Sequence, residues 1–482
     1  MSDPVLIVGA GPVGLTTALA LHRYDVPAVV VEKHPGTSVQ PKARRFTFRT
    51  MEVFRSLGVA DAVYAAAEGL AAHQAMRTGR TLADSEPLPP PPHVDYGSLA
   101  AISPEQSCLV AQDLLEPVLL REVRARGIPV HFRTALTDLA QDDTGVTARI
   151  GEPLRAAYVV GADGAHSTVR DLLGVPVAGR GTLGDAVNVY FEADLDAVTA
   201  GREFNLCQVT EPVPGAFASV DGRYRWLFLT TEPPAGADWA DVVRQAIGVP
   251  GTDVTVLSAL AWQPAMRVAE RFRVGRVFLA GDAAHVMPPY AALGANTGIQ
   301  DAADLAWKIA SVRAGTAGPG LLETYHEERH AAGWHTAEQS VLRGTPGATG
   351  LDHPFALVAG YQYATGALVD DGADPQPTDR LELTGRPGTR LPHLRVGGLS
   401  TLDLVGTRPT LLPGPAADDW RRAADKLDIP VADAGPGWPA AAGIDPDGAL
   451  LVRPDHVVAW RSRGTGDVAA LAAARDTVLR RD

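Results

Sequence analysis

The sequence Gly9-Ala-Gly11-Pro12-Val-Gly14 follows the apolar run Val5–Val8 and opens a segment with helical character at 12–23. Four consecutive apolar residues that end at a glycine are typical of a buried parallel strand. Between a strand and a helix, the first glycine permits a tight turn, the second lets a pyrophosphate approach the backbone, and the third allows close helix packing. The proline suits the first helical turn, whose N–H groups add positive partial charge. These residues predict a dinucleotide site at the start of a doubly wound α/β sheet.

The second predicted strand, Ala28–Glu32, ends in a carboxylate that stands 18 residues after Gly14. At this place a carboxylate can accept hydrogen bonds from ribose hydroxyls. A glycine-rich turn that binds nothing would leave Glu32 unexplained, so we expect dinucleotide binding. The motif by itself does not separate FAD from NAD.

Length and charge narrow the class of protein. At about 100–200 residues per domain, 482 residues predict two to four domains. Hydrophobic residues make up 46% and charged residues 21% of the chain, as in ordinary globular enzymes. The net charge of −13 argues against a nucleic acid or an anionic membrane as partner. The apolar stretch 4–21 contains three glycines and follows Asp3, so we expect neither a signal peptide nor a membrane helix.

The two cysteines, Cys108 and Cys207, are far apart in the sequence and belong to no CxxC motif. This usage excludes a disulfide scaffold and a thiolate zinc site. We expect reduced thiols, a cytoplasmic protein and no bound metal.

Other segments predict the rest of the architecture. Alternating residues suggest antiparallel strands at 186–192, 204–210 and 224–230, and apolar runs suggest buried strands at 158–161 and 277–280. Helices are expected at 49–57, 112–126, 297–314 and 321–339. The proline-rich stretch 86–92 is expected to be a surface loop. Short strands at 410–412, 449–452 and 457–460 with a closing helix predict a separate small α/β domain.

Two predicted strands are each followed by a pair of neighbouring residues, one aspartate and one glycine. Asp163-Gly164 follows strand 158–161, and Gly281-Asp282 follows strand 277–280. A buried aspartate at a strand end can accept a hydrogen bond from a sugar-alcohol hydroxyl. The sequence Gly294-Ala295-Asn296-Thr297 then opens a helix, whose free backbone N–H groups can face an anionic ring oxygen.

On these motifs the chain resembles the class A flavoprotein aromatic hydroxylases, which modify aromatic polyketides and other phenolic natural products. Asp163-Gly164 matches the family's DG motif, and Gly281-Asp282 matches its GD motif. Further matches are the helix under the flavin at 296–298 and 301–308, the PRA…RTME stretch at 41–43 and 49–52, and the cofactor-contacting Gln112. Residues 400–406, 448–455 and 458–461 resemble the thioredoxin-like tail of the longer members.

The resemblance implies a Rossmann-like FAD-binding domain of the para-hydroxybenzoate hydroxylase type. An antiparallel-sheet substrate domain is inserted in it, and a thioredoxin-like α/β domain follows. We expect the FAD-binding domain at 1–70, 100–180 and 265–345, the middle domain at 71–99 and 181–264, a linker at 346–385 and the C-terminal domain at 386–482. The C-terminal domain lacks redox cysteines, so a structural role is expected for it.

The activity implied by the resemblance is that of a monooxygenase of antibiotic biosynthesis. FAD binds without a covalent bond, NADPH or NADH reduces it, and O2 is the co-substrate. A flavin C4a-hydroperoxide then hydroxylates a polycyclic aromatic polyketide. A Baeyer–Villiger or epoxidising reaction on the same scaffold is an alternative. Another is an FAD-fold protein that binds and shields an intermediate with little redox turnover. Whether the protein is a monomer or a homodimer stays open.

The resemblance also implies site residues. Pro288 would flank the oxygen site, and Arg49 and Tyr290 are candidates to meet a substrate phenolate. The residues expected at the cofactor are Gly9, Gly11, Pro12, Gly14, Glu32, Lys33, Lys42, Arg49, Gln112, Asp163, Gly164, Gly281, Asp282, Pro288, Gly294, Ala295, Asn296 and Thr297. Aromatic residues of the middle strands are candidates for the substrate pocket, although most of them are expected in the core: Phe204, Phe217, Tyr224, Trp226 and Phe228.

Two departures from the family's pattern stand out. Ala291 and Ala292 occupy the place of two glycines before the flavin-facing loop, and methyl groups there would limit movement of the flavin ring. Lys42 replaces an arginine, and lysine cannot make the same bidentate contact. These departures are the only support for the shielding alternative.

Overall fold

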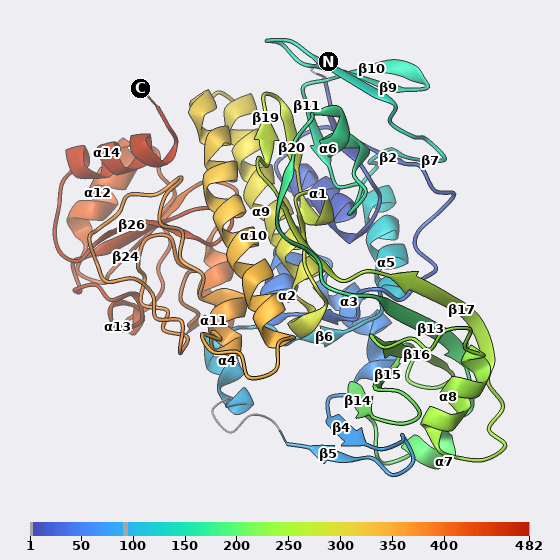
Figure 1. The fold of residues 1–482 in the computed structure, drawn as a ribbon. Helices are drawn as coiled ribbons and strands as arrows, with labels where there is room; N and C mark the ends of the chain where they lie inside the picture. Colours follow the sequence, from blue (N-terminus) through green and yellow to red (C-terminus); the bar gives the residue numbers. More distant parts are fainter. Residues whose placement is uncertain (1–2, 90–94, 482) are drawn as a thin grey trace.

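The computed structural model describes residues 3–89 and 95–481, which fold around a mostly parallel six-stranded sheet (Figure 1). Its strands run in the order β19-β20-β11-β1-β2-β7, and only β19 is antiparallel to its neighbour. They are β1 (Val5–Val8), β2 (Ala28–Glu32), β7 (Val130–Phe132), β11 (Tyr158–Gly161), β19 (Arg273–Val274) and β20 (Val277–Leu279). This is the α/β fold expected from the strand–turn–helix unit at the N-terminus.

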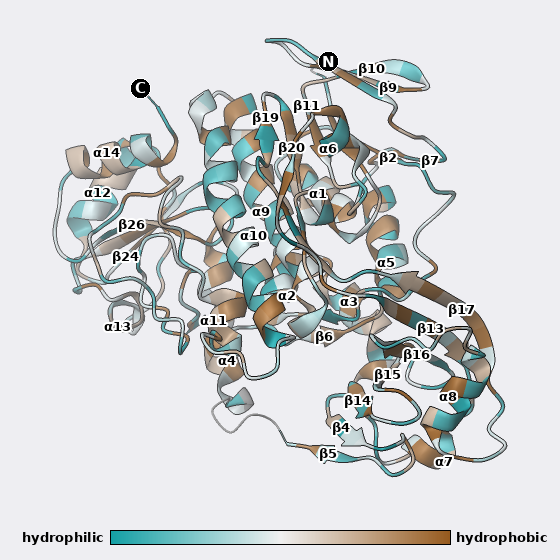
Figure 2. Ribbon diagram, viewed as in Figure 1, coloured by the Kyte–Doolittle hydropathy of each residue, from teal (hydrophilic) through white to brown (hydrophobic). Residues whose placement is uncertain are grey.

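Helices and small sheets cover the central sheet. The helices are α1 (Pro12–Arg23), α2 (Phe48–Ser56), α3 (Ala60–Ala66), α4 (Leu99–Ile102), α5 (Gln112–Ala125), α6 (Thr168–Leu172), α9 (Gly294–Arg313) and α10 (Glu323–Arg343). The strands are β3 (Arg45–Phe46), β6 (Cys108–Leu109), β8 (Asp138–Gln141), β9 (Val146–Ile150), β10 (Glu152–Ala156), β12 (Val177–Thr182), β18 (Ala265–Ala269) and β21 (His285–Val286). In Figure 2, α9 and α10 carry both apolar and polar colours. Several of their charged residues are nevertheless buried: Asp301, Asp304, Lys308, Glu328 and Arg329.

A seven-stranded sheet forms the middle part, with the order β17-β13-β16-β15-β14-β4-β5. Its strands are β4 (Met76–Gly79), β5 (Glu86–Leu88), β13 (Ala186–Glu192), β14 (Leu206–Val209), β15 (Gly215–Ser219), β16 (Arg225–Thr230) and β17 (Thr255–Trp262), with helices α7 (Asp196–Thr199) and α8 (Trp239–Ile247). All pairs are antiparallel except β4–β14. The expectation of a loop over 86–92 is wrong for Glu86–Leu88, because an edge strand accepts Pro87. Residues 90–92 lie outside the described residues.

The C-terminal domain is built on a three-stranded antiparallel sheet that lies on one side of α9 and α10 (Figure 1). Its elements are α11 (Pro354–Ala359) in the preceding segment, β22 (Arg395–Val396), β23 (Leu399–Ser400), β24 (Thr410–Pro413), α12 (Asp418–Lys426), α13 (Trp438–Ala442), β25 (Ala449–Val452), β26 (Val458–Ser462) and α14 (Val468–Val478). These parts agree with the expected α/β domain, the inserted antiparallel-type sheet and the small C-terminal α/β domain. The residue boundaries between these parts stay a prediction.

Arg453 joins the C-terminal domain to the helices of the central domain. Its side chain is 0% exposed, and its guanidinium donates to Glu328 Oε1 at 2.7 Å, to Asp304 Oδ2 at 2.8 Å and to Asp455 Oδ2 at 2.5 Å. Lys308 Nζ lies 2.8 Å from both Asp304 and Glu328. Burial raises the pKa of Asp304 well above its ordinary value, and the neighbouring Glu328 carboxylate adds to this rise. Two cationic side chains thus meet three carboxyl groups in this buried cluster.

Glu52 forms a second buried contact with the C-terminal segment. Its carboxylate accepts hydrogen bonds from Arg49 Nη1 at 2.9 Å, Arg390 Nε at 2.9 Å and Ser103 Oγ at 2.6 Å. Burial alone would raise the pKa of Glu52, but the guanidinium groups of Arg390 and Arg49 lower it to about 2. Ionised Glu52 therefore stabilises the contact between α2 and the C-terminal segment.

No helix in the described ranges combines the length and the apolar character needed to cross a membrane.

Replacement of Glu52 by glutamine should change how stability depends on pH. The pKa of Glu52 lies near 2 in the folded protein and at 4.5 ordinarily. Its ionisation therefore stabilises the fold fully above pH 4.5, and this stabilisation is lost as the pH falls toward 2. A shift of this size corresponds to about 3 kcal/mol. We expect Glu52→Gln to lower the free energy of unfolding by about that amount at pH 7. Denaturant titrations at several pH values should show the difference closing in acid.

Glu152→Gln, at an exposed carboxylate of β10, is the matched control and should leave the pH profile unchanged. A constant difference between Glu52→Gln and the parent protein from pH 7 to pH 3 would contradict the assigned pKa.

Candidate functional site

The turn between β1 and α1 leaves open space at its second glycine. Gly9 has φ +110°, and a Cβ there would lie 2.3 Å from the Ala162 carbonyl oxygen. A Cβ on Gly14 would lie 1.9 Å from the Gly9 carbonyl oxygen. At Gly11 the nearest atom is Glu116 Oε1, at 3.9 Å. Packing thus requires the first and third glycines, whereas the second borders a space that a pyrophosphate fits.

The N–H groups of this turn are available to an anion. Gly11 is the N-cap of α1 and provides no side-chain cap. The first backbone hydrogen bond of the helix runs from the Leu15 N–H to the Gly11 carbonyl oxygen, at 3.0 Å. Among the described residues, the N–H groups of Gly11, Val13 and Gly14 have no acceptor. The residues expected around a dinucleotide pyrophosphate therefore fit that group.

Glu32 is held beside the turn by backbone hydrogen bonds. Its Oε2 accepts from Ala10 N–H and its Oε1 accepts from His34 N–H, both at 2.9 Å. The side chain is 13% exposed, so the remaining lone pairs can accept from ribose hydroxyls. The next residue, Lys33, is exposed.

A second carboxylate, Glu116, borders the turn and was not among the residues predicted from the sequence. It is 2% exposed, and its oxygens accept from Ser38 N–H at 2.5 Å and from the Gln112 amide at 2.6 Å. Gln112 Oε1 in turn accepts from Ala43 N–H at 3.3 Å. Together they hold segment 36–43 against α5. Burial raises the pKa of Glu116. The helical i,i+4 spacing from Gln112 was the signal that could have identified it.

The DG and GD motifs play different parts. Asp163 accepts from Ser167 Oγ at 2.5 Å and from Val169 N–H at 3.1 Å, so its carboxylate orders the start of α6. Burial raises its pKa. The Asp282 side chain is exposed and has no hydrogen-bond partner in the described part of the chain. The protein around Asp282 raises its pKa, an effect that His285 and Lys42 oppose. Asp282 is thus free to accept from a ribityl hydroxyl.

The N-terminus of α9 lies next to the Asp282 carboxylate. A Cβ on Gly294 would lie 3.9 Å from Asp282 Oδ1. Among the described residues, the N–H groups of Gly294, Ala295 and Asn296 have no acceptor. The expectation for Thr297 is wrong in this respect, because its N–H donates to the Leu293 carbonyl at 2.9 Å. Three free N–H groups at a helix N-terminus can hold negative charge at a flavin pyrimidine edge.

The Asn296 side chain ties the start of α9 to the start of α2. Its Oδ1 accepts from Thr47 N–H at 2.8 Å and from Thr50 Oγ1 at 2.6 Å, while its Nδ2 donates to the Ala292 carbonyl at 2.6 Å. This side chain is fully used inside the protein, so only its backbone N–H can face a cofactor.

The loop before α9 adopts a strained conformation. Ala291 has φ +65° and Ala292 has φ +56°, in the left-handed region that glycine occupies freely. Each alanine there costs about 1–2 kcal/mol. The loop is held by Ser340 Oγ, which lies within hydrogen-bond distance of the carbonyls of Pro288 at 2.6 Å and Tyr290 at 3.0 Å. Pro288 is buried, and Tyr290 is half exposed over Gly344.

The geometry does not support Arg49 as a residue that meets a phenolate. It is buried, it pairs with Glu52, and its Nη2 donates to the Asp455 carbonyl at 2.7 Å. Arg49 therefore belongs to the contact with the C-terminal domain. Sequence spacing could not show this, because its partners lie far away in the chain.

The aromatic residues proposed for the substrate pocket lie elsewhere. Phe204, Phe217, Trp226 and Phe228 are fully buried in the core under α7 and α8, so their assignment to a substrate surface is not supported. Tyr224 is exposed and stacks with Arg223, at 4.6 Å from guanidinium to ring centre. The opposite face of the sheet carries Tyr190, Ala218 and Leu227, which pack against Ala111 and Leu114 next to Gln112.

Among the residues that the structure describes, no group of three or more His, Cys, Asp and Glu side chains could hold a metal ion.

Alanine substitutions at Gly11 and Gly14 should separate cofactor binding from folding. At Gly11 the backbone is extended, so Gly11→Ala is tolerated and should stabilise the cofactor-free protein by about 0.4–1 kcal/mol. Its methyl group would fill the space left for a pyrophosphate, and we expect dinucleotide affinity to fall about tenfold or more. Gly14→Ala should instead unfold the protein at lower temperature, because of its clash with Gly9. Thermal unfolding and flavin-fluorescence titration measure the two effects. Equal cofactor affinity of Gly11→Ala and the parent protein would contradict the assignment.

Comparison with known proteins identifies the family. Residues 2–340 match the family described as FAD binding domain, and residues 384–481 match the family described as aromatic-ring hydroxylase, C-terminal. A putative polyketide hydroxylase of Streptomyces halstedii is 40% identical, over 95% of this chain and 93% of that protein. A tetracenomycin A2 monooxygenase-dioxygenase of Streptomyces glaucescens is 37% identical, over 99% of this chain and 97% of that protein.

Solved structures agree with the sequence comparisons. The ternary complex of aklavinone-11 hydroxylase with FAD and aklavinone has a TM-score of 0.88, 34% identity and 99% coverage of both chains. The flavin-dependent monooxygenase PieE, in complex with FAD and substrate, has a TM-score of 0.88, 34% identity and 100% coverage of both chains. With its glycine turn, Glu32, Asp282 and the N-terminus of α9 arranged around one place, the chain belongs to the FAD-dependent aromatic-ring hydroxylases, a family of flavoprotein monooxygenases.

Proposed function

We propose that this protein hydroxylates a polycyclic aromatic polyketide, with NADPH or NADH as reductant and O2 as co-substrate. The observation that carries the proposal is the meeting of Asp282 with the three free N–H groups at the start of α9. The relatives named polyketide hydroxylase and the aklavinone complex of aklavinone-11 hydroxylase support the substrate class.

The chain's own residues have distinct tasks in this reaction. FAD, when bound and reduced, supplies the activation of O2. Gly11, Val13 and Gly14 would bind the pyrophosphate through N–H groups, and Glu32 would bind the ribose. Asp282 would orient the ribityl chain. The α9 N–H groups would stabilise negative charge at the pyrimidine edge without any reorganisation during the reaction, because the helix fixes them beforehand.

The substrate would lie on the face of the middle sheet that is turned away from α8. Strand alternation places Asn188, Ala216 and Leu229 on this face, all half-buried. Trp262 Nε1 donates to Asn188 Oδ1 at 3.0 Å, and Ser258 Oγ lies 3.2 Å from Gln40 Oε1 in the segment that Glu116 holds. An apolar surface with a few fixed polar groups suits a flat polycyclic phenol.

The shielding alternative keeps one supporting observation, the restricted backbone of Ala291 and Ala292 next to α9. It predicts bound FAD with no NAD(P)H oxidation that depends on an aromatic ligand.

The buried thiols of Cys108 and Cys207 are not joined in a disulfide and are compatible with the proposed cytoplasmic location.

Turnover of the FAD-loaded protein tests the proposed function. NADPH and NADH oxidation and O2 consumption are followed with and without a panel of anthraquinone-type phenols, and products are identified by mass spectrometry and NMR. We expect a panel member to accelerate oxidation and to gain one oxygen atom on an aromatic carbon. A product with oxygen inserted into a ring bond would establish the Baeyer–Villiger alternative, and an epoxide the epoxidising one. Bound FAD that neither nicotinamide reduces would establish the shielding alternative.

A larger side chain at Ala216 should obstruct the proposed substrate face. We expect Ala216→Leu to raise KM for the aromatic substrate about tenfold, because the three added carbon atoms displace a stacked ring. FAD affinity should stay unchanged, since the cofactor contacts lie on other elements. Ala259→Leu, at an exposed position of β17, is the matched control. Unaltered KM in Ala216→Leu would place the substrate elsewhere.

A further inference from the structure

The outer edge of the middle sheet is unpaired along β17. In the described part of the chain this strand pairs with β13 alone, and its backbone makes no hydrogen bond outside that ladder. Figure 1 shows β17 along the outer margin of the sheet, and in Figure 2 most of its length has apolar colours. A row of backbone N–H and C=O groups on this edge is therefore open to water or to another strand.

The usual protection of an edge strand is missing from β17. The opposite edge of the same sheet, β5, is three residues long and contains Glu86 and Pro87, which both hinder pairing with another chain. In contrast, β17 is eight residues long and contains no proline, glycine or charged residue. Its one irregularity is a bulge at Leu257, so the segment Ser258–Trp262 forms a regular stretch of strand.

Exposed apolar side chains gather along this edge. Leu257 and Leu260 are 45% and 43% exposed. Leu183 is 40% exposed, and its N–H donates to the carbonyl of Pro264, just beyond the end of β17, at 2.8 Å. Val39 is 76% exposed, and it adjoins the Gln40 that bonds Ser258. These four side chains, here called the β17 patch, mark an interaction surface.

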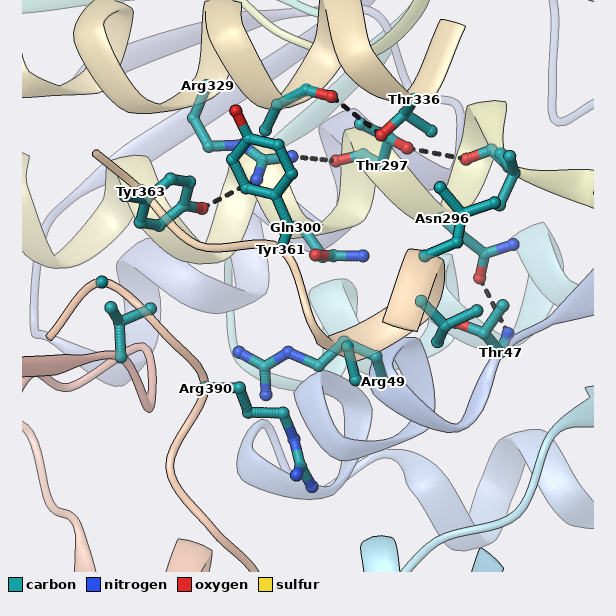
Figure 3. Close-up of a pocket in the computed structure, with 17 residues that line it drawn as sticks. Thr47, Arg49, Asn296, Thr297, Gln300, Arg329, Thr336, Tyr361, Tyr363 and Arg390 are labelled. Atoms are coloured by element: carbon teal, nitrogen blue, oxygen red, sulfur yellow. Dashed lines mark hydrogen bonds between the residues drawn. The ribbon is translucent and has the colours of Figure 1, made fainter. Parts of the chain in front are cut away.

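Polar groups inside the protein differ from those on this edge, because they have partners within the chain. In the cavity behind the first turn of α9 (Figure 3), Arg329 donates to the Thr297 carbonyl at 3.1 Å and to the Tyr363 hydroxyl at 2.8 Å. Arg49, in the same cavity, pairs with Glu52. The outer backbone groups of β17 have no such partner in the described residues.

The strand is complementary to a second copy of itself. In an antiparallel pair about a two-fold axis, opposite residues point to the same face, so one residue must lie opposite its own copy. With Leu260 on the axis, the regular segment Ser258–Trp262 pairs over its whole length. Ala259 then lies opposite Ala261 of the second copy. This register brings no charges together, and the small alanines let the two strands approach.

We propose that this protein forms a homodimer through β17, with the two strands antiparallel and Leu260 of each copy meeting at the two-fold axis. The two seven-stranded sheets would join into one continuous sheet, and the β17 patch would be removed from water. This inference does not depend on the proposed reaction, because only the strand edge and its exposed side chains enter it.

The association is expected to be reversible. One strand and four apolar side chains per copy form an interface smaller than the standard size of about 1,600 Å². We therefore expect a dissociation constant on the order of 10 μM. In dilute turnover assays the chain is then monomeric, so Ala259→Leu keeps its use as a control for the substrate face.

Sedimentation velocity of the FAD-loaded protein tests the dimer. We expect the average mass to rise from one chain to two as the concentration passes through about 10 μM. Leu260→Lys would place two ammonium groups side by side at the axis and should keep the protein monomeric throughout. Leu399→Lys makes the same change at an exposed residue of the C-terminal domain and should dimerise like the parent. The mass of one chain at every concentration would overturn the proposal, as would a dimer that persists in Leu260→Lys.

Opposite charges at position 260 test the register. Leu260→Lys and Leu260→Glu should each be monomeric alone, because like charges meet at the axis. An equimolar mixture of the two should form mixed dimers, since an ammonium group then lies opposite a carboxylate. Equal Tm values of both variants and the parent establish that the fold is intact. A mixture that stays monomeric would remove Leu260 from the axis and overturn the proposal.

Discussion

The burial of Arg453 is the constraint on which the arrangement of the domains depends. A guanidinium that loses all contact with water costs several kcal/mol unless its partners are in place, and here they come from α9, α10 and its own strand end. A shift of the C-terminal domain on these helices would separate Arg453 from its partners on α9 and α10. The domain carries neither of the chain's two cysteines, so its contribution is this fixed contact rather than thiol chemistry.

The same helix, α9, links that contact to the candidate cofactor site. Asp304 and Lys308 lie in its middle, and its free N–H groups lie at its start. Between them, Asp301 accepts from the Gly281 N–H at 3.0 Å and from Arg329 Nε at 2.7 Å. The GD motif, the first turns of α9 and helix α10 thus share one buried carboxylate. A shift of any one of them would break hydrogen bonds of the others, so the polar groups around Asp282 are fixed before a ligand arrives.

Helices and strands that depend on neighbouring residues alone could be predicted from the sequence. Val5–Val8, Pro12–Arg23, Ala28–Glu32 and Tyr158–Gly161 agree with the structure residue by residue, because apolar runs and glycines determine each of them nearby. Prediction from the sequence failed where the partner is distant: Arg49 meets Asp455, and Arg453 meets Glu328. Phe217 and Phe228 lie opposite each other in β15 and β16 and so share one face, but strand alternation in the sequence could not show which face α8 covers. Only tertiary packing decides this, and it buried the aromatic face.

The two alanines before α9 restrict the backbone of the loop that precedes this helix. Glycines at these positions would let the loop sample several backbone conformations, whereas Ala291 and Ala292 are confined to a narrow left-handed region. The strain persists because Ser340 holds the carbonyls of Pro288 and Tyr290, and Asn296 holds the carbonyl of Ala292. The loop is thus bonded at both ends to helices that the Arg453 cluster already fixes. A site built in this way has little freedom next to the flavin position, so movements needed for reduction or substrate exchange would fall to the ligand or to the middle sheet rather than to this loop.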